Sequence, residues 1–382
     1  MLNNAGLYIH IPFCIHKCPY CDFYSVSDLQ SVPAFADCLV AEIRMKKNQA
    51  AGSLVFDSIY IGGGTPTVMD ARDISRIMEA VFKAFRIDRH AEITIEANPG
   101  TIGQKQLGEL RMAGINRINI GVQSFDDATL AFLGRIHEGK DSMNALRMAE
   151  KSGFDNIGMD MIYAVPGQSL NNWQNDLERA ASFKPAHISC YMLTPEVSTP
   201  MDEDRKAGKF NMPPESLQEA LFLMTSGILF EYGYEHYEIS NFAASLRHRS
   251  RHNTKYWNNA PYLGLGPAAH SYLPPQRTAN VRSVRRYLRM VKKKTQPVEV
   301  CETLTKEQQM IEALYLGLRQ SAGVTCRDFN ARFKADFFTL FAGLIDHFTQ
   351  KGLITADETV CRLTEKGMLM HESIAGAFID RL

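Results

Sequence analysis

Residues 7–25 read LYIHIPFCIHKCPYCDFYS, and this stretch decides how the rest of the chain is interpreted. Its first half carries apolar side chains at every second position from 7 to 13, a pattern that predicts a β-strand. Three cysteines follow at once in the spacing Cys14-x₃-Cys18-x₂-Cys21. Thiolates this close in sequence can serve one metal centre, so the stretch predicts a strand that leads into a metal-binding loop.

Soft sulfur ligands select zinc or iron–sulfur clusters. A structural zinc site normally takes four protein ligands, so zinc would need His10, His16 or a distant residue as the fourth. A four-iron cluster held by three thiolates leaves one iron open and is therefore reactive. Three ordinary buried thiols are the remaining alternative. These ligand rules alone leave all three alternatives open.

Composition sets the broad class. The chain has 382 residues, 45% of them hydrophobic, and its 42 Lys and Arg balance its 42 Asp and Glu. No whole-chain charge therefore favours a nucleic-acid partner, and no apolar run has the length that a bilayer needs. The N-terminus lacks the basic start and apolar core of a signal peptide.

The cysteines indicate the compartment. Eight cysteines in a chain of this size are too sparse for a disulfide framework. Five of them stand alone in the sequence: Cys38, Cys190, Cys301, Cys326 and Cys361. We therefore expect a reducing, cytoplasmic location.

Strand-like and helix-like segments alternate over the first half of the chain. Strands are expected at 7–12, 56–64, 92–99, 117–125, 156–168 and 187–193. Helices are expected at 34–47, 71–85, 102–114, 141–153 and 170–183. This alternation predicts an α/β fold with a parallel sheet built from βα units.

The predicted strands end in glycine or polar residues. In βα barrels the loops after the strands build the active site, so we expect these loops to meet on one rim. They hold Cys14–Cys21, Gly62–Thr65, Glu96–Pro99, Gln123–Phe125 and Asp160–Gly167.

After residue 195 the pattern changes. A helix is expected at 214–233, a further strand at 234–243 and a long loop at 244–280. A structureless run of that length in a compact protein is usually functional. Helical patterns then return and end in a hairpin candidate over 354–367. We predict a barrel domain over 1–243, a basic loop and linker region over 244–302, and a smaller, mostly helical, winged-helix-like domain over 303–382.

The polar residues of the rim have plain alternatives. A GGG turn over Gly62–Gly64 could be only a tight turn, although glycine also lets backbone approach a ligand closely. Glu96, Gln123 and Asp160 could be solvated loop entrances or helix caps. Arg135, in the loop after the fourth strand, could be a surface arginine or could pair with a carboxylate.

The cysteine spacing resembles the signature of the radical S-adenosylmethionine (SAM) superfamily. In that superfamily the open iron is chelated by SAM, and the aromatic residue before the third cysteine, here Tyr20, lies against the adenine. The order YIHIPFCxxxCxYC, GGGTPT, IEANP, GVQSF and DMIYAVPGQ further resembles the oxygen-independent coproporphyrinogen III oxidase group. This resemblance covers nearly the whole chain and implies a radical-SAM partial (β/α)₆ barrel.

The resemblance also implies roles for individual residues. The positions that match one SAM site are Tyr8, Gly63, Gly64, Thr65 and Glu96. The positions that match a second SAM in the oxidase are Gln123, Arg135 and Asp160.

Three features resemble the heme chaperone branch of that group more closely than the oxidase. Cys21 is followed by Asp22-Phe23, where the oxidase carries a further cysteine. Only about seven residues precede the first predicted strand, and residues 252–257 match the HNxxYW motif of that branch.

The HNxxYW segment also suits heme chemically. His252 offers an imidazole for heme iron, and Tyr256 and Trp257 offer flat apolar faces for a macrocycle. The neighbouring cations that could pair with propionates are Arg247, Arg249, Arg251 and Lys255. The alternative is a solvated basic loop with an aromatic anchor.

A second basic run extends from Arg282 to Lys294 and holds seven cations and no acid. It predicts an amphipathic helix with Val284, Tyr287, Leu288 and Val291 on one side. Such a helix could touch an anionic membrane, or it could simply be a solvated surface helix.

These patterns lead to one expected function and one alternative. We expect a heme chaperone that holds a [4Fe-4S] cluster, SAM and heme and delivers heme to acceptor heme proteins. The alternative is a radical SAM enzyme that oxidatively decarboxylates the propionates of coproporphyrinogen III. We expect no such oxidase activity, although the residues of the radical SAM machinery are present.

Overall fold

The computed structural model describes residues 3–47 and 54–382. Within them, one twelve-stranded sheet has the order β12-β11-β10-β9-β1-β2-β3-β4-β5-β6-β8-β7. Its central strands run parallel: β1 (Asn3–Ile11), β2 (Leu54–Gly63), β3 (Ile87–Ala97), β4 (Arg117–Gln123), β5 (Ile157–Tyr163) and β6 (His187–Met192). They confirm the six predicted strands and their order.

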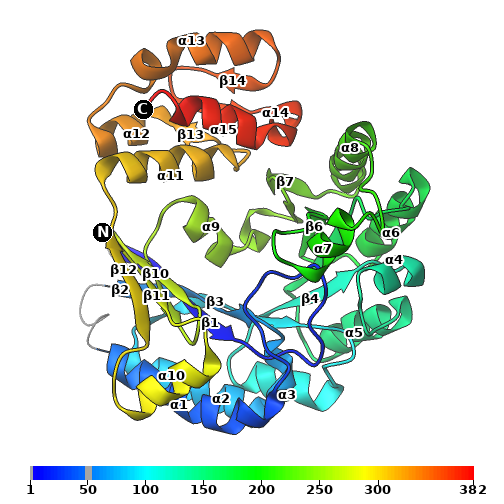
Figure 1. Cartoon of the computed structure of the whole chain (residues 1–382), viewed down its shortest axis with the longest axis vertical. Helices are drawn as coiled ribbons and strands as arrows, with labels where there is room; N and C mark the ends of the chain where they lie inside the picture. The colour runs from blue at the N-terminus through cyan, green and yellow to red at the C-terminus, as the bar shows by residue number, and fades with distance from the viewer. Residues whose placement is uncertain (1–2, 48–53) are drawn as a thin grey trace.

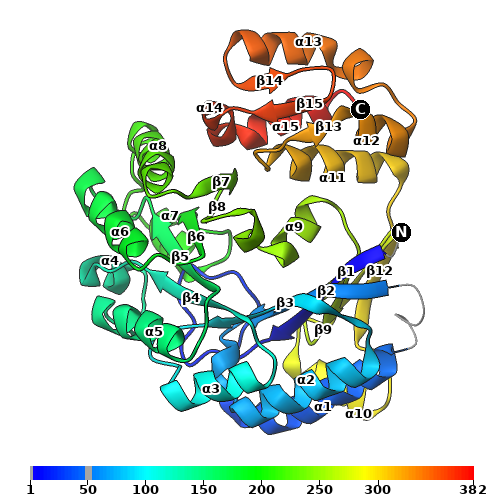
Figure 2. The ribbon, with the colours of Figure 1, turned by 180° about the vertical axis from the view of Figure 1, so that it is seen from behind.

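Helices between these strands cover the outer, convex face of the sheet (Figures 1 and 2). They are α1 (Val32–Lys46), α2 (Ala71–Ala84), α3 (Gln104–Met112), α4 (Asp127–Phe132), α5 (Gly139–Lys151) and α6 (Leu170–Ser182). The five predicted helices are present, and the short α4 was not predicted. The sheet curves without closing, so the α/β partial barrel is confirmed.

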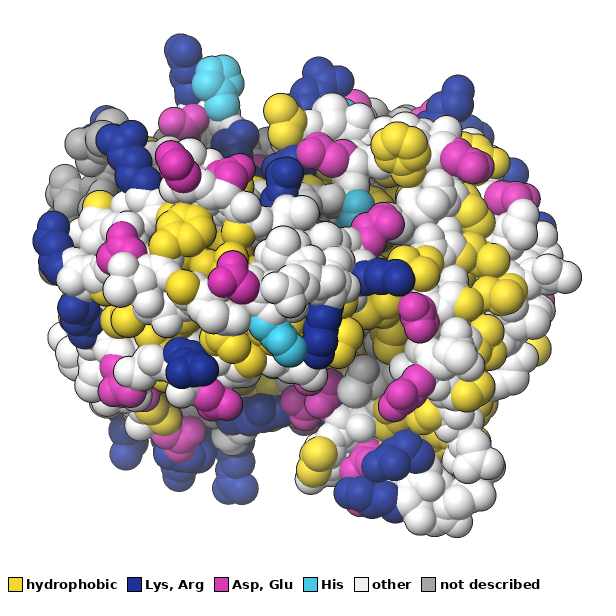
Figure 3. Space-filling view, turned by 90° about the horizontal axis from the view of Figure 1, so that it is seen from above, with side chains coloured by type: hydrophobic (Ala, Val, Ile, Leu, Met, Phe, Trp, Pro, Cys, Tyr) yellow, Lys and Arg dark blue, Asp and Glu magenta, His cyan; other side chains and the backbone are white. Residues whose placement is uncertain are grey.

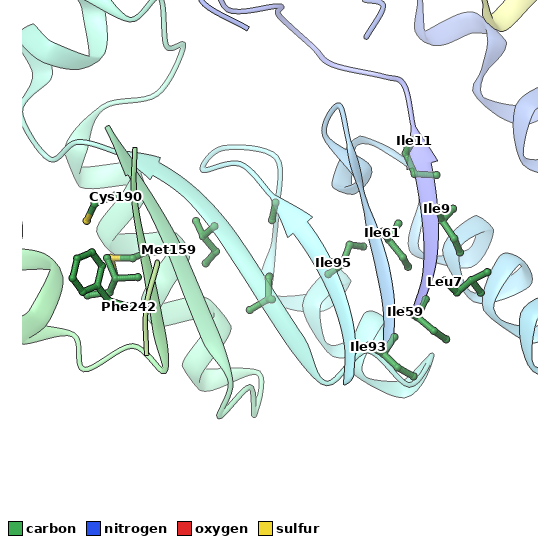
Figure 4. Packing of buried hydrophobic residues seen from close by; sticks show 14 of the residues in the cluster. Leu7, Ile9, Ile11, Ile59, Ile61, Ile93, Ile95, Met159, Cys190 and Phe242 are labelled. Atoms are coloured by element: carbon green, nitrogen blue, oxygen red, sulfur yellow. The ribbon is translucent and has the colours of Figure 1, made fainter. Parts of the chain in front are cut away.

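The core lies between the sheet and these helices. Alternate residues of neighbouring strands form rows on the helix side, and one row joins Ile9, Ile61 and Ile95 (Figure 4). Each of the three is at most 1% exposed. Full burial of such a side chain stabilises the fold by roughly 1.5–3 kcal/mol. The residues between them point the other way, into the concave side, and there they are polar.

The prediction of a long loop over 244–280 is wrong. This part of the chain is ordered as η3 (Leu246–His248), α9 (Arg251–Trp257), β9 (Tyr262–Leu265), β10 (His270–Leu273) and β11 (Gln276–Asn280). Strand β9 pairs in parallel with β1, with Leu263 beside Leu7, and β10 to β12 (Val298–Thr303) extend the sheet. The strands escaped prediction because four or five residues are too few for an alternating pattern to stand out.

Two neighbouring elements refine other predictions. The segment 234–243 forms two strands, β7 (Glu235–Glu238) and β8 (Asn241–Ala243), and β8 pairs antiparallel with β6. The segment before them holds α7 (Pro200–Lys206) and α8 (Glu215–Glu231). The antiparallel hairpin thus ends the sheet on the β6 side.

The basic run forms α10 (Val284–Lys292), as predicted. Val284, Tyr287 and Val291 are buried, and the Tyr287 hydroxyl donates a 2.7 Å hydrogen bond to the buried Glu42 of α1. The apolar side of the helix is therefore used inside the protein, which leaves the cations outside.

The C-terminal elements form a smaller unit over the concave side of the sheet (Figure 1). They are α11 (Lys306–Leu318), β13 (Val324–Thr325), α12 (Cys326–Phe333), α13 (Phe337–Gln350), β14 (Ile354–Ala356), β15 (Val360–Leu363), α14 (Glu365–Leu369) and α15 (His371–Ile379). The hairpin β14–β15 confirms the predicted one, while β13, α12, α14 and α15 were missed. Phenylalanines of α12, α13 and α15 pack together at its centre.

The equal numbers of acidic and basic residues in the sequence are reflected on the surface. Seen from the side of the C-terminal helices, Lys and Arg are interspersed with Asp and Glu rather than gathered into one field (Figure 3). None of the helices in the described ranges combines the length and the apolar composition of a membrane-spanning segment. The remaining short 3₁₀ turns are η1 (Leu29–Ser31) and η2 (Pro66–Val68).

Candidate functional site

A cavity of about 560 Å³ opens where the parallel strands end. This volume lies within the range typical of small-molecule sites. The cavity brings together most of the predicted site residues: Cys14, Cys18, Tyr20, Cys21, Gly63, Gly64, Thr65, Glu96, Gln123, Arg135 and Asp160. Tyr8, His252, Tyr256 and Trp257 are not among the residues that line it.

The three thiols of the motif all line this cavity. Each is half-buried and unpaired. Thr65 Oγ1 donates a hydrogen bond to Cys14 Sγ, and Arg135 Nη1 donates one to Cys18 Sγ, both at 3.6 Å. Donors aimed at sulfur stabilise the thiolate form that a metal centre requires. The donor set therefore fits an iron–sulfur cluster.

The zinc alternative fits less well. Within residues 3–47 and 54–382, no three His, Cys, Asp or Glu side chains are arranged to hold one metal ion. A four-iron cluster needs no such convergence, because each thiolate binds a different iron. His10, one possible fourth ligand, has both ring nitrogens engaged, with the Tyr24 carbonyl at 2.8 Å and the Tyr8 hydroxyl at 3.0 Å.

Asn98 connects the groups that touch the sulfurs. Its Nδ2 donates to Thr65 Oγ1 at 2.7 Å, and its Oδ1 accepts from Arg135 Nη2 at 2.6 Å. The amide thus orients both the hydroxyl beside Cys14 and the guanidinium beside Cys18. We did not single out Asn98 from the sequence, although its place directly after the third strand was the available signal.

Glu96 lies deeper, at the end of β3. It accepts a hydrogen bond from the Tyr60 hydroxyl at 2.7 Å and another from the Gly63 backbone N–H at 3.1 Å. Burial raises the pKa of Glu96 to about 7, despite these two donors. This carboxyl group is therefore poised to gain or lose a proton near neutral pH. Tyr60 was missed, although it is one of the inward positions of the alternating run in β2.

Asp160 and Gln123 complete the polar wall on the far side of the cavity. Asn119 Nδ2 donates to Asp160 at 2.6 Å, and burial raises the pKa of Asp160 above its ordinary value. Gln123 has a φ of 65°, in the left-handed region that a non-glycine residue seldom adopts. Such backbone strain at a cavity wall is typical of functional positions.

The glycines after β2 serve the packing of the strand ends. Gly63 has a φ of 109°, and a Cβ there would lie 2.5 Å from the His10 ring. A Cβ on Gly64 would lie 2.6 Å from the Phe13 carbonyl oxygen. Side chains are therefore excluded by the protein itself. Contact with a ligand at these glycines stays a prediction.

The HNxxYW segment is helix α9 and not a loop. His252 is fully buried, with Nδ1 3.1 Å from the Ser58 hydroxyl and Nε2 2.9 Å from the Tyr256 hydroxyl. Asn253, which we did not predict as a site residue, lines the cavity instead. Trp257 lies against Tyr237, with ring centroids 5.8 Å apart. Heme ligation by this segment stays a prediction, and in this arrangement both nitrogens of His252 are engaged.

Three of the four neighbouring cations are engaged with the protein. Lys255 forms a 2.6 Å ion pair with Asp57, and Arg251 donates to the backbone carbonyls of Asp57 and His90. Arg249 pairs with Glu235. Arg247 remains exposed. Pairing of these cations with propionates stays a prediction; in this arrangement three of the four anchor α9 and its flanks to the sheet.

Comparisons with known proteins agree with this architecture. Residues 8–180 match the Radical SAM superfamily and residues 304–370 match the HemN C-terminal domain. A solved structure described as coproporphyrinogen III oxidase (HemN) from Escherichia coli superimposes with a TM-score of 0.85 over 100% of this chain and 91% of that chain, at 23% identity. That likeness establishes the fold.

Two relatives match end to end. The heme chaperone HemW of Bacillus subtilis is 33% identical over 378 residues, which cover 98% of this chain and 99% of the relative. The heme chaperone HemW of Lactococcus lactis is also 33% identical over 378 residues, covering 99% of this chain and 97% of the relative. A chain with this fold, this thiol-lined cavity and these full-length relatives belongs to the HemW family of the radical SAM superfamily.

Proposed function

We propose that this protein is a heme chaperone, which binds heme and passes it to acceptor heme proteins. One observation carries the proposal: the cavity lined by three thiols occurs in a chain that matches proteins named heme chaperone HemW over their whole length. The acceptor is identified only by its chemistry, as a protein that requires heme.

In this proposal Cys14, Cys18 and Cys21 would hold a [4Fe-4S] cluster. Glu96 and its polar neighbours in the cavity wall would hold SAM. When bound, the cluster and SAM together supply one-electron chemistry. The chain's own part is to bind and orient: Arg135 and Thr65 donate to the sulfurs, while Asn98 holds both donors in place.

The mouth of the cavity offers a docking place for a flat apolar macrocycle. Phe23 is 71% exposed and Tyr191 is 41% exposed, and both line the opening. His16, also at the opening, is an exposed imidazole, whereas His252 is enclosed. We therefore propose that heme first meets the protein at this mouth. Ligation by His252 would require α9 to move away from Ser58 and Tyr256.

Hemin titration with two histidine variants tests the proposal. Anaerobically reconstituted protein is titrated with hemin while the Soret band is followed. We expect His16→Ala to weaken hemin binding about tenfold, in line with the loss of one ligand contact. His347→Ala on the exposed side of α13 is the matched control and should change nothing.

For His252→Gln the thermal midpoint must also be measured, because His252 is buried and its loss could destabilise the protein. If this variant keeps its thermal midpoint and loses hemin binding, heme reaches His252 and α9 opens. If neither histidine variant differs from the control, heme docks elsewhere. A wild-type protein that leaves the hemin spectrum unchanged would refute the chaperone proposal itself.

A second candidate is a coproporphyrinogen III oxidase. The observation in its favour is that Gln123, Arg135 and Asp160, which match a second SAM site of the oxidase, all line the cavity. Anaerobic assay of coproporphyrinogen III with SAM and a reductant distinguishes the two functions. We expect no loss of carboxyl groups, and robust decarboxylation would favour the oxidase.

Location and membrane contact are further parts of the proposal. All eight cysteines are unpaired, which supports a reducing compartment such as the cytoplasm. Arg285 and Arg289 of α10, and Lys293 directly after it, are exposed on the side opposite the buried one. We propose weak contact with anionic membranes through this side. Reversing these three charges should abolish sedimentation with vesicles that contain phosphatidylserine, since each cation near such a surface contributes about 1 kcal/mol.

A further inference from the structure

A groove on the helix-covered side of the sheet is lined by cations that lack acidic partners. Helix α10 lies beside α1 (Figures 1 and 2), and a groove of about 720 Å³ opens along it. The cations that line this groove are Arg285, Arg289, Lys292 and Lys293. All four are exposed, and within residues 3–47 and 54–382 none of them takes part in an ion pair. Asp28 is the one acid among the lining residues that the structure describes, so the groove carries a net positive charge.

One short segment separates this groove from the cavity that the thiols line. Tyr24 and Val26 line the groove. Cys21 and Phe23, from the same segment, line the cavity. The Val26 carbonyl also accepts the backbone N–H of Cys14 at 3.0 Å. The segment that follows the third motif cysteine therefore has one side in the groove and the other in the cavity.

Helix α10 is fixed to this segment by two hydrogen bonds. Arg282, just before the helix, donates from Nη2 to the Asp22 carbonyl at 3.0 Å. The Val284 N–H donates to the Tyr24 hydroxyl at 2.9 Å. Asp22 directly follows Cys21 in the sequence. The basic groove is thus held at a defined place beside the metal-binding loop.

A cluster on the three thiols would have to receive its electrons from outside the chain. Such a cluster works in one-electron chemistry and is reduced one electron at a time. In the proposed function the cavity is filled by ligands, so the groove side of the segment is the side that stays open to an electron carrier. A positive surface beside a redox centre speeds the arrival of an acidic partner, and complexes that pass electrons are typically small and transient.

We propose that the groove along α10 is the docking surface of an acidic protein that carries single electrons and reduces the cluster on Cys14, Cys18 and Cys21. One electron leaves the redox group of the carrier, which is oxidised, and enters the cluster, which is reduced. No bond forms or breaks, and no proton is transferred. The proposal rests on the cluster assigned in the proposed function and does not depend on heme delivery.

The same cations would make the membrane contact proposed above. A concave site fits a convex protein better than it fits a flat bilayer, and the groove lies directly behind the metal-binding loop. These two features favour the electron carrier. Because both partners need the same cations, they should exclude each other from this surface.

Electron-transfer kinetics test the groove directly. Anaerobically reconstituted protein is mixed with a reduced acidic flavodoxin, and the oxidation of its flavin is followed by absorption. We expect Arg289→Glu combined with Lys292→Glu to lower the second-order rate constant about 10- to 100-fold at low salt, because the steering charge is reversed. The difference should shrink toward about 1 M salt, where the Debye length is only about 3 Å. Arg327→Glu combined with Lys334→Glu, which changes two exposed cations of the C-terminal unit, is the matched control and should have no effect.

Two further measurements separate docking from damage to the cluster. Reduced methyl viologen, a small cation that needs no docking surface, should reduce the cluster of the double variant at least as fast as that of the wild type. Calorimetry should show that the wild type binds flavodoxin and that the double variant binds it at least about tenfold more weakly.

Distinct outcomes overturn the proposal. Equal rate constants for the wild type and the double variant at low salt would show that the groove is no docking surface. Slow reduction of the variant by both reductants, with unchanged flavodoxin affinity, would refute it as well. If the wild type sediments with phosphatidylserine vesicles but does not bind flavodoxin, the groove serves the membrane and the carrier site is refuted. If no cluster forms, the cluster assignment fails, and calorimetry with the full chain still tests the groove.

Discussion

Replacing Glu96 by glutamine should make the protein more stable, and increasingly so as the pH rises. Glu96 is half-buried in the cavity wall at the end of β3, and its pKa is raised from 4.5 to about 7, chiefly by desolvation. Glu96 accepts from the Tyr60 hydroxyl through Oε1 and from the Gly63 N–H through Oε2. Glutamine has nearly the same shape: its amide oxygen can accept from the Gly63 N–H, and its NH₂ group can donate to the Tyr60 hydroxyl oxygen. The substitution therefore removes the charge while a hydrogen bond can still form at both positions, with the direction reversed at Tyr60.

The sign and the magnitude of this stability difference follow from the linkage between proton binding and folding. A carboxyl group with a raised pKa binds its proton more tightly in the native state, so its contribution to stability is complete below pH 4.5 and is lost as the pH rises through 7. A shift of about 2.5 units corresponds to at most about 3 kcal/mol. We expect Glu96→Gln to exceed the wild type by about 1 kcal/mol at pH 5 and by about 3 kcal/mol at pH 8.

Urea denaturation at both pH values measures this difference. Trp173 and Trp257, the two tryptophans of the chain, both lie in the sheet-bearing part, so their fluorescence reports on the unfolding of that part. Glu231→Gln, at the exposed end of α8, is the matched control and should have little effect at either pH. A Glu96→Gln variant that is less stable than the wild type at pH 8 would refute the reasoning, because the charge would then be stabilising.

The same ionisation should govern SAM binding. If the cationic amine of SAM approaches Glu96, as its place beside the glycine turn predicts, binding favours the ionised carboxylate and expels a proton. Affinity should then fall about tenfold between pH 8 and pH 6, because the free protein becomes protonated below pH 7. In Glu96→Gln this dependence should vanish. Calorimetry in buffers of different ionisation enthalpy measures how many protons are released when SAM binds. If no proton is released, Glu96 does not interact with SAM.

Three shorter predictions concern the thiols and α9. Replacing the three motif cysteines by alanine should abolish iron and sulfide uptake on reconstitution, whereas Cys38→Ala, a buried thiol on α1, should not; intact four-iron content in the triple variant would contradict the assignment. Arg135→Met should lower the reduction potential of the cluster, measured by redox titration, because a cation that donates to sulfur favours the more negative, reduced state; an unchanged potential would contradict it. Lys255→Met should lower the free energy of unfolding by about 3 kcal/mol, because it leaves the Asp57 carboxylate without its ion-pair partner. Adding Asp57→Asn should recover most of that loss, as measured in a double-mutant cycle.

The parallel part of the sheet could be predicted because its signals are long and redundant. Strands of six residues or more alternate with amphipathic helices, and each strand ends in a loop of polar residues or glycine. The topology of parallel strands then brings Cys14, Glu96 and Asp160 to one edge, although they are far apart in sequence. Distances within the site could not be predicted in the same way, since hydrogen bonds such as Asn98 to Arg135 depend on the exact positions of side chains.

The antiparallel extension of the sheet could not be predicted for a physical reason. Strands β9 to β11 hold four or five residues each, and their pairing partners include β1, more than 250 residues away in sequence. So short a segment has no strong preference of its own, and the neighbouring strand decides its conformation. A basic composition then made the segment look solvated, whereas Lys255 and Arg251 are tied to the sheet.

The spacing of the HNxxYW motif is typical of a helix. His252 and Tyr256 are four residues apart, as are Asn253 and Trp257, so a helix places each pair on its own face. The structure uses both faces. His252 is hydrogen-bonded to Tyr256 and to Ser58 in the middle of β2, while Asn253 lines the cavity. At the N-terminus of α9, Ser250 reaches Tyr237 and through it His187 at the start of β6.

Helix α9 and its N-cap therefore connect the middle of β2 with the start of β6. Its Asn253 lines the same cavity as the cysteines. In the proposed function the histidine of this motif can reach heme only if the helix moves away from Ser58. Because both nitrogens of His252 are engaged, amide hydrogen exchange can tell where hemin binds. If hemin ligates His252, the amides of residues 251–257 must become exposed to exchange. If hemin binds and exchange in α9 does not change, hemin must be held at the mouth of the cavity.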